Sequence, residues 1–315
     1  SDVFFKSDSI GETRIVGSII TNQFDLGKTI DNPNFGLLSM NGSLDALAQF
    51  EDNRLIFSGK IPRIDYKGYS YSNITMDGTI RDEIFKGKLA VKDENLEFDF
   101  NGGVDFSTPR LQKYDFEAEL KRANLRNINW SSRDSSTQVT GRLQVNMVGN
   151  KFEDLDGYFK LNDITWKENG EIYKVDSINL NAIKEDNREL IILKSDLMVA
   201  KIEGTYNLDE IFPTMVNVFS KEIPSLVKDI ELNNFKGGNK FNVMFKLLDY
   251  SMINKLFLPE LKLSDRTRLS GRFNDVNKSF VLHFATDSLM INGRIIKDIK
   301  LNSNNIGNKL NIIGQ

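Results

Sequence analysis

Residues that could carry out catalysis are few in this chain of 315 residues. There is no cysteine and a single histidine, His283, so neither a thiolate site nor a two-histidine metal site can form. Nucleophilic catalysis would then need an activated serine, threonine or lysine. One S-x-x-K motif occurs at Ser225 and Lys228, but the S-D-N and K-T-G motifs that accompany it in penicillin-binding enzymes are missing.

Paired carboxylates could act as a general acid and base. Asp154 and Asp156 form such a pair, but they alternate with apolar strand residues, which favours a solvated strand surface. His283 lies opposite Phe280, Leu282 and Phe284 in its strand pattern, which favours a structural role. No nucleotide-binding glycine loop and no EF-hand loop occurs. The sequence predicts a protein that is not an enzyme and uses no cofactor or metal.

Bulk composition limits the partners. The 41 basic and 44 acidic residues nearly cancel and are interspersed, which predicts no nucleic-acid partner. No run of 18 apolar residues occurs, and the first residues lack the pattern of a signal peptide. Because the last residues fall within a strand pattern, we expect the chain to be an internal segment of a longer protein.

The elements that must position any functional residue are strands, because apolar residues alternate with polar ones along most of the chain. Eleven times an apolar residue, a glycine and a second apolar residue occur two positions apart, which places all three on one strand face. A glycine there lets a sheet bend. The predicted sheet-bending residues are Gly17, Gly42, Gly59, Gly78, Gly87, Gly102, Gly141, Gly157, Gly204, Gly271 and Gly293.

Such strands must cover their apolar face. Roughly 20 strands spaced about 4.8 Å apart would extend about 100 Å, too far for one compact barrel. We therefore expect a mainly β fold, an elongated curved antiparallel sheet folded into a U-shaped groove with its apolar side inside and filled by acyl chains. The predicted groove-lining residues are Phe57, Met76, Phe85, Leu89, Phe98, Phe100, Leu143, Phe159, Ile202, Phe245, Phe273 and Ile291. A dry core made by the same side chains is the alternative.

Helical periodicity interrupts the strands. It predicts a helix within 207–232, capped by Asn207 with Glu210 three residues on as its capping-box partner. The regular helix is expected to begin near Pro213 after a looser turn, and a second short helix is expected after Pro224. A further helical turn is expected at 250–257. These helices either cover the apolar sheet face, or act as a movable gate or as a docking site for a partner. We expect modules at 1–106, 107–208 and 238–315, with a helical insertion at 209–237.

Several stretches resemble TamB proteins of the Bacteroidota type, which belong to the AsmA-like superfamily of bridge-like lipid transporters. They are Tyr69–Ile80, Phe85–Leu89, Asp93–Gly102, Arg188–Leu197 and Lys255–Pro259 with Leu269–Phe273. The helical segment with Phe219 and Pro224 resembles the same family. Each motif is mainly a strand pattern, and the family's membrane anchor and its barrel-contacting region have no counterpart in this segment.

The resemblance implies a periplasmic segment, anchored in the inner membrane in the full-length protein, whose groove conducts phospholipid acyl chains to the outer membrane. It further implies an outer-membrane barrel of the TamA or BamA type as a partner, contacted through parts absent from this segment. One alternative is a scaffold that pairs its free sheet edges with strands of outer-membrane proteins. A weaker alternative is an extracellular β-solenoid adhesin.

Overall fold

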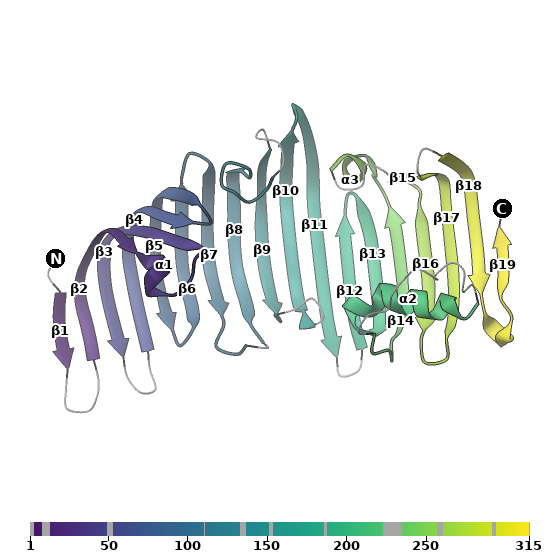
Figure 1. Ribbon diagram of the computed structural model, residues 1–315, viewed down its shortest axis with the longest axis horizontal. Helices are drawn as coiled ribbons and strands as arrows, with labels where there is room; N and C mark the ends of the chain where they lie inside the picture. The colour runs from purple at the N-terminus through teal and green to yellow at the C-terminus, as the bar shows by residue number, and fades with distance from the viewer. Residues whose placement is uncertain are drawn as a thin grey trace. The chain divides into compact units, whose positions relative to one another are not determined.

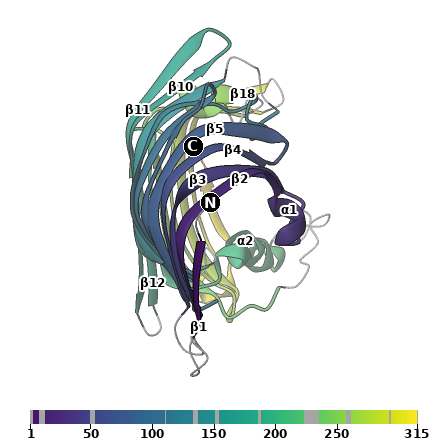
Figure 2. The same cartoon turned by 90° about the vertical axis from the view of Figure 1, so that its left-hand side faces the viewer.

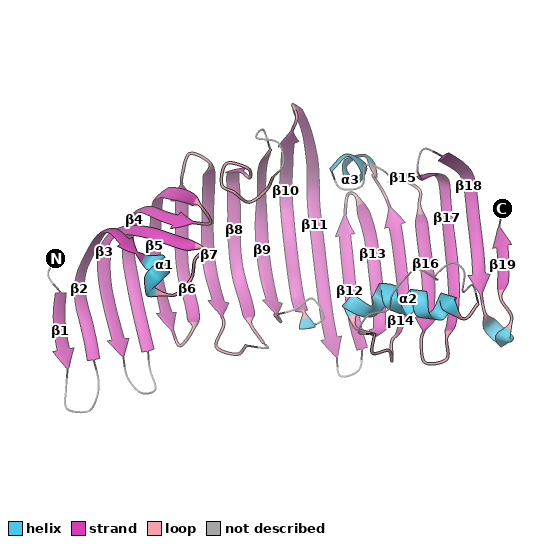
Figure 3. Cartoon of the chain, viewed as in Figure 1, coloured by secondary structure: helices cyan, strands magenta, loops and turns pink. Residues whose placement is uncertain are grey.

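The computed structural model describes residues 3–7, 13–48, 53–109, 111–132, 137–150, 154–185, 188–222, 235–256, 261–291 and 294–314. Strands dominate these residues (Figure 3). They are β1 Val3–Ser7, β2 Thr13–Asp25, β3 Phe35–Ala48, β4 Asn53–Tyr66, β5 Tyr69–Arg81, β6 Ile84–Lys92, β7 Leu96–Asp105, β8 Lys113–Asn124, β9 Gln138–Val148, β10 Asp156–Glu168, β11 Glu171–Glu185, β12 Arg188–Ser195, β13 Met198–Thr205, β14 Lys240–Leu247, β15 Leu261–Leu263, β16 Arg268–Asn274, β17 Ser279–Ile291, β18 Arg294–Asn304 and β19 Asn311–Gly314.

Helices are few and short among the described residues. The α-helices are α1 Leu26–Thr29, α2 Ile211–Ser220 and α3 Ser251–Leu256, and the 3-10 turns are η2 Leu208–Glu210 and η4 Ile306–Asn308. The predicted looser turn before the main helix is η2, and α2 begins at Ile211, two residues before Pro213. The proline is tolerated there because the first turn of a helix has no intrahelical acceptors for its N–H groups. The predicted second helix after Pro224 lies outside the described residues.

The sheet is antiparallel and open, and consecutive strands pair with each other almost throughout. The exception is the short β15, which pairs with β17, so that β14 pairs directly with β16. This arrangement confirms the predicted mainly β fold and its curved antiparallel sheet. The chain forms two compact units, the first with residues 1–148 and 160–174, the second with 149–159 and 175–315. The three modules expected from the sequence remain a prediction.

In the first unit, strands β2 to β5 bend so that α1 lies on the inside of the bend (Figure 2). The apolar face is this inner face, and one end of it is closed by a buried cluster of Tyr71, Ile74, Val91, Ala123 and Ile128. Ile128 comes from the turn after β8 and is fully buried. This cluster forms the core at one end of the strands, and Phe57, Val145 and Met147 are buried farther along them.

A local change in the strand backbone aligns the side chains of this core. Tyr71 and Ile74 are three residues apart, yet both are buried in the same cluster. Asn73 between them adopts a left-handed conformation with φ 51°, which turns the strand so that Ile74 returns to the face of Tyr71. The pairing register with β4 is unchanged across this point, from Ile61 opposite Ile74 to Arg63 opposite Ser72. Asp298 adopts the same conformation between Ile296 and Ile299, with φ 55°.

In the second unit, α2 lies across the apolar face of the sheet (Figure 1). Val218 of α2 and Phe241, Phe273 and Phe280 of β14, β16 and β17 form a core in which each side chain is at most 2% exposed. The smaller helix α3 contributes Ile253 to a separate cluster with Leu247 and Tyr250. Part of the apolar face of this unit is therefore covered by the chain's own helices.

Candidate functional site

The inner face of the first unit carries apolar residues in register across seven strands. One row runs through Gly42, Gly59, Met76, Leu89, Phe100, Ala118 and Leu143, each paired with the next. The neighbouring row runs through Leu44, Phe57, Gly78, Gly87, Gly102, Phe116 and Val145. We call these two rows the inner apolar rows. Because side chains two apart share a face, both rows project from the same side of the sheet.

An aromatic ladder crosses the inner apolar rows. The ring centroids of Phe85 and Phe100 are 6.0 Å apart, and those of Phe100 and Phe116 are 5.0 Å apart. All three side chains are partly exposed, as are Met76 and Leu89 beside them. Phe116 was not among the residues predicted from the sequence, although the alternation of Tyr114, Phe116, Ala118 and Leu120 contains the signal for it.

Glycines give the rings room to lie along the sheet. A Cβ at Gly78 would stand 2.7 Å from Cε2 of Phe85, and a Cβ at Gly42 would stand 2.8 Å from Cε2 of Phe57. Gly102 and Gly204 instead have φ values of 144° and 152°, a region that other residues rarely adopt. Gly141 has no such close contact, because the nearest atom to its Cβ position is 3.4 Å away, and its φ lies outside that region. The glycines thus differ in what they do, and Gly293 lies outside the described residues.

The predicted groove-lining residues fall into two groups. Met76, Phe85, Leu89, Phe98, Phe100 and Leu143 are partly exposed on the inner face of the first unit, and Phe57 there is 5% exposed. In the second unit, Phe159 and Phe245 are partly exposed, whereas Ile202 and Phe273 are buried in the core with α2. The side chain of Ile291 lies outside the described residues. The first unit therefore brings most of the predicted set together on one surface.

A buried carboxylate fixes the strands next to this surface. Asp93 is 3% exposed and accepts hydrogen bonds from the Tyr69 hydroxyl at 2.5 Å and from the Ser72 hydroxyl and N–H at 2.7 and 3.0 Å. Burial raises the pKa of Asp93, but these bonds and one from the Asn95 N–H outweigh it, so the pKa is lowered. The network ties the turn between β6 and β7 to strand β5.

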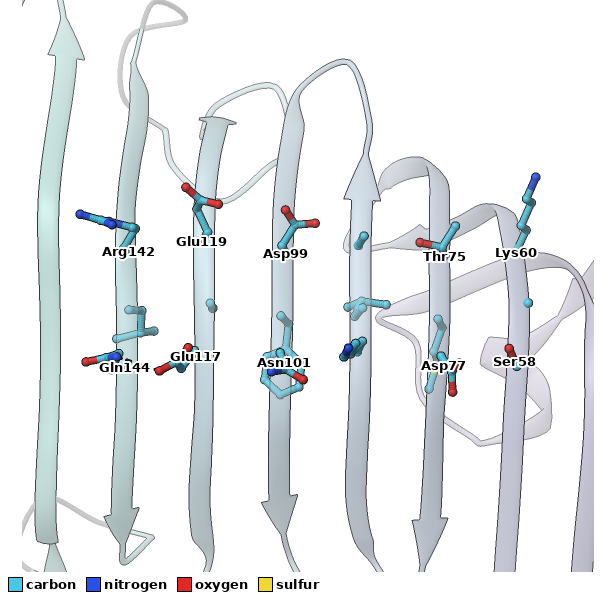
Figure 4. A pocket seen from close by; sticks show the side chains of 18 of the residues that line it. Ser58, Lys60, Thr75, Asp77, Asp99, Asn101, Glu117, Glu119, Arg142 and Gln144 are labelled. Carbon is cyan, nitrogen blue, oxygen red and sulfur yellow. Dashed lines mark hydrogen bonds between the residues drawn. The ribbon is translucent and has the colours of Figure 1, made fainter.

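The outer face of the first unit is polar and its charges are largely paired. A depression of about 1070 Å³ lies on this face. Its polar side chains stand in two rows across neighbouring strands (Figure 4). One row includes Asp99 and Glu119, and Lys121 lies 2.6 Å from Asp99. Arg142 forms an ion pair with Asp163. Paired surface charges of this kind are typical of a solvated face rather than of a reactive site.

Candidate metal ligands are not grouped among the described residues. Within them, no group of three or more His, Asp or Glu side chains could hold a metal ion. His283 is exposed, and its Nδ1 lies 2.6 Å from Oδ1 of Asn302. Asn207 accepts the N–H of Asp209, but the predicted partner Glu210 binds the N–H groups of Lys236 and Gly237 instead of closing a capping box.

The described part of the chain contains no helix that is both long and apolar enough to cross a membrane. Comparison with protein-family models, with curated proteins and with solved structures returned no match. The partly exposed inner apolar rows of the first unit are therefore the candidate functional surface on structural grounds alone.

Proposed function

We propose that the inner apolar rows of the first unit hold acyl chains, and that the chain is a segment of a periplasmic bridge that transports phospholipid between membranes. The observation that carries the proposal is the difference between the two aromatic clusters. In the second unit Phe219 of α2 covers Phe273 and Phe280, which are 0% and 2% exposed. In the first unit the ladder of Phe85, Phe100 and Phe116 stays partly exposed.

Physical reasoning supports an apolar occupant. Contiguous exposed apolar surface is unfavourable in water by about 25 cal/mol per Å², and large patches mark interaction sites. Rows of methionine, leucine and phenylalanine offer no directional polar contacts, which suits a flexible hydrocarbon chain rather than a ligand recognised by hydrogen bonds. The resemblance of Tyr69–Ile80 and its continuation to TamB proteins favours a phospholipid as the source of that chain.

Two neighbouring residues of β5 provide a matched test. Met76→Asp places a carboxylate on the inner face, whereas Thr75→Asp places it on the outer face, next to Lys60 in the register. Both variants add one negative charge to the same strand. Lipids extracted from each purified protein are quantified by mass spectrometry, and circular dichroism checks that the variants fold.

We expect Met76→Asp to lose most of the co-purifying phospholipid, because burying a carboxylate against acyl chains is strongly unfavourable. Thr75→Asp should retain the wild-type amount. Leu89→Asp, on the adjacent strand, should repeat the loss. Equal lipid content in the folded Met76→Asp and Thr75→Asp proteins would refute the proposal.

A further inference from the structure

The outer face of the second unit carries three cations in one cross-strand row. Lys246 of β14 pairs in register with Arg268 of β16, Arg268 pairs with Ala285 of β17, and Ala285 pairs with Lys300 of β18. Directly paired residues project from the same face of a sheet, so the three cations share one surface. All three side chains are exposed.

These cations have no acidic partner among the residues that the structure describes. Glu203 lies 2.6 Å from Lys201 and also binds Arg188, and Asp287 lies 3.9 Å from Arg266. Asp298, two residues from Lys300 on β18, forms no ion pair with any of the three described cations. Like charges directly opposite each other on a sheet are destabilising, and Lys246 and Arg268 form such a pair. The outer face of the first unit shows the contrasting arrangement, in which Lys121 and Arg142 have carboxylate partners.

A hollow of about 560 Å³ lies among the three cations. Its lining includes the polar residues Lys246, Arg268, Lys300, Ser270, His283 and Asn302. No acidic residue is part of this lining. Ala285 occupies the position between Arg268 and Lys300, so no long side chain separates the two cations.

Polar groups beside the cations add directional contacts. Ser270, His283 and Asn302 are paired in register in the next row of the same face. Nδ1 of His283 lies 2.6 Å from Oδ1 of Asn302, which fixes the imidazole ring and leaves Nε2 on its far side. A serine hydroxyl and a guanidinium group are both donors that bind phosphate oxygens in proteins.

We propose that this hollow, the cationic hollow, binds a phosphate group through Arg268, Lys246 and Lys300, with Ser270 as an additional donor. A guanidinium binds two phosphate oxygens at once, and the two lysines add positive charge on either side. Arg268 and Lys300 lie two strands apart, about 10 Å between their Cα atoms, which leaves room for one phosphate between their side chains. The phosphate comes from a lipid headgroup or from a small soluble phosphate.

Four probes distinguish these sources. Titration calorimetry measures the binding of inorganic phosphate and of glycerol 3-phosphate, and co-sedimentation measures binding to vesicles of phosphatidylglycerol and of phosphatidylcholine. Binding to phosphatidylglycerol vesicles in preference to phosphatidylcholine vesicles assigns a lipid headgroup. Binding to the soluble phosphates alone assigns a soluble ligand. Absence of binding to all of these probes overturns the proposal.

Variants locate the binding. The Arg268→Gln/Lys300→Gln double variant should weaken binding about a hundredfold, because each charged contact contributes about tenfold or more. The control Lys60→Gln/Lys88→Gln removes two positive charges from the outer face of the first unit and should change binding less than twofold. If both double variants weaken binding equally, the attraction depends on net charge and the cationic hollow is not the site.

Ala285→Asp separates binding from folding. The new carboxylate would stand between Arg268 and Lys300, where it is expected to relieve the repulsion among the cations and leave the protein at least as stable as wild type. It should nevertheless abolish phosphate binding. Wild-type phosphate affinity in this variant would contradict the proposal. Because the hollow lies on the polar outer face, the phosphate experiments are independent of the lipid measurements on the inner apolar rows.

Discussion

Gly78→Ala tests whether the glycines make room for the aromatic ladder. The added Cβ would stand 2.7 Å from Cε2 of Phe85 and 3.2 Å from the carbonyl oxygen of Lys86. Both distances are shorter than normal van der Waals contacts, so the ring of Phe85 has to move. Overpacking of this kind costs about 1–3 kcal/mol. The smaller conformational entropy of alanine in the unfolded chain offsets about 0.4–1 kcal/mol of that cost.

The net effect is a loss of about 1–2 kcal/mol in the free energy of unfolding of the first unit. For a unit of this size, that lowers Tm by about 2–8 °C. Both tryptophans of the chain, Trp130 and Trp166, belong to the first unit, so thermal unfolding followed by tryptophan fluorescence reports on this unit.

Gly141→Ala is the matched control. The nearest atom to its new Cβ would be 3.4 Å away, an ordinary contact, so the entropic gain remains and Tm should rise by about 1–4 °C. In a Phe85→Leu background, which lacks the Cε2 atom, Gly78→Ala should lose most of its cost. If Gly78→Ala raises Tm as Gly141→Ala does, or if its cost is unchanged by Phe85→Leu, the steric explanation is wrong.

Three further predictions concern stability. Gly102→Ala should lower the Tm of the first unit more than Gly78→Ala, as measured by the same fluorescence melts. The new Cβ would stand 2.5 Å from Cα of Phe116, and the φ of 144° at this position is strained for alanine. Asp93→Asn should destabilise this unit at pH 7, and its difference from wild type in urea unfolding should shrink below about pH 4. The reason is that a lowered pKa stabilises the fold above the unfolded value of about 3.9 and ceases to do so as pH falls through the folded value. Phe273→Ala, at a 0% exposed position, should cost about 3–5 kcal/mol and speed amide hydrogen exchange in β14 and β16 while leaving the tryptophan transition of the first unit in place.

Alternation in the sequence was sufficient to predict the strands and their apolar face, and helical periodicity was sufficient to predict the position of α2. Met76, Leu89 and Phe100 were placed on one face by spacing alone, and the structure aligns them in one row. Register between strands could not be predicted, because it depends on turns and on irregularities such as the register shift between Thr21 and Phe24 of β2. The stacking of Gly78, Gly87 and Gly102 in one row follows only from that register.

Contacts between residues distant in the sequence were equally beyond prediction. The side-chain amide of Asn239 donates to a carboxylate oxygen of Glu210 at 2.8 Å and to one of Asp275 at 3.2 Å, although Glu210 and Asn239 are 29 residues apart in the sequence. A residue expected to cap a helix therefore anchors a loop instead. The four-residue helix α1 is too short to show helical periodicity. The cationic hollow arises because Lys246, Arg268 and Lys300 come from strands that are adjacent only after folding.

Site-specific photo-crosslinking tests the central proposal most directly. A photoreactive amino acid replaces Leu89 on the inner face in one variant and Lys88, its neighbour on the outer face, in another, and crosslinked products are identified by mass spectrometry. The acyl-chain proposal predicts phospholipid adducts at position 89 and few at position 88. Equal lipid adducts at both positions, or adducts at position 89 only to protein, would contradict it.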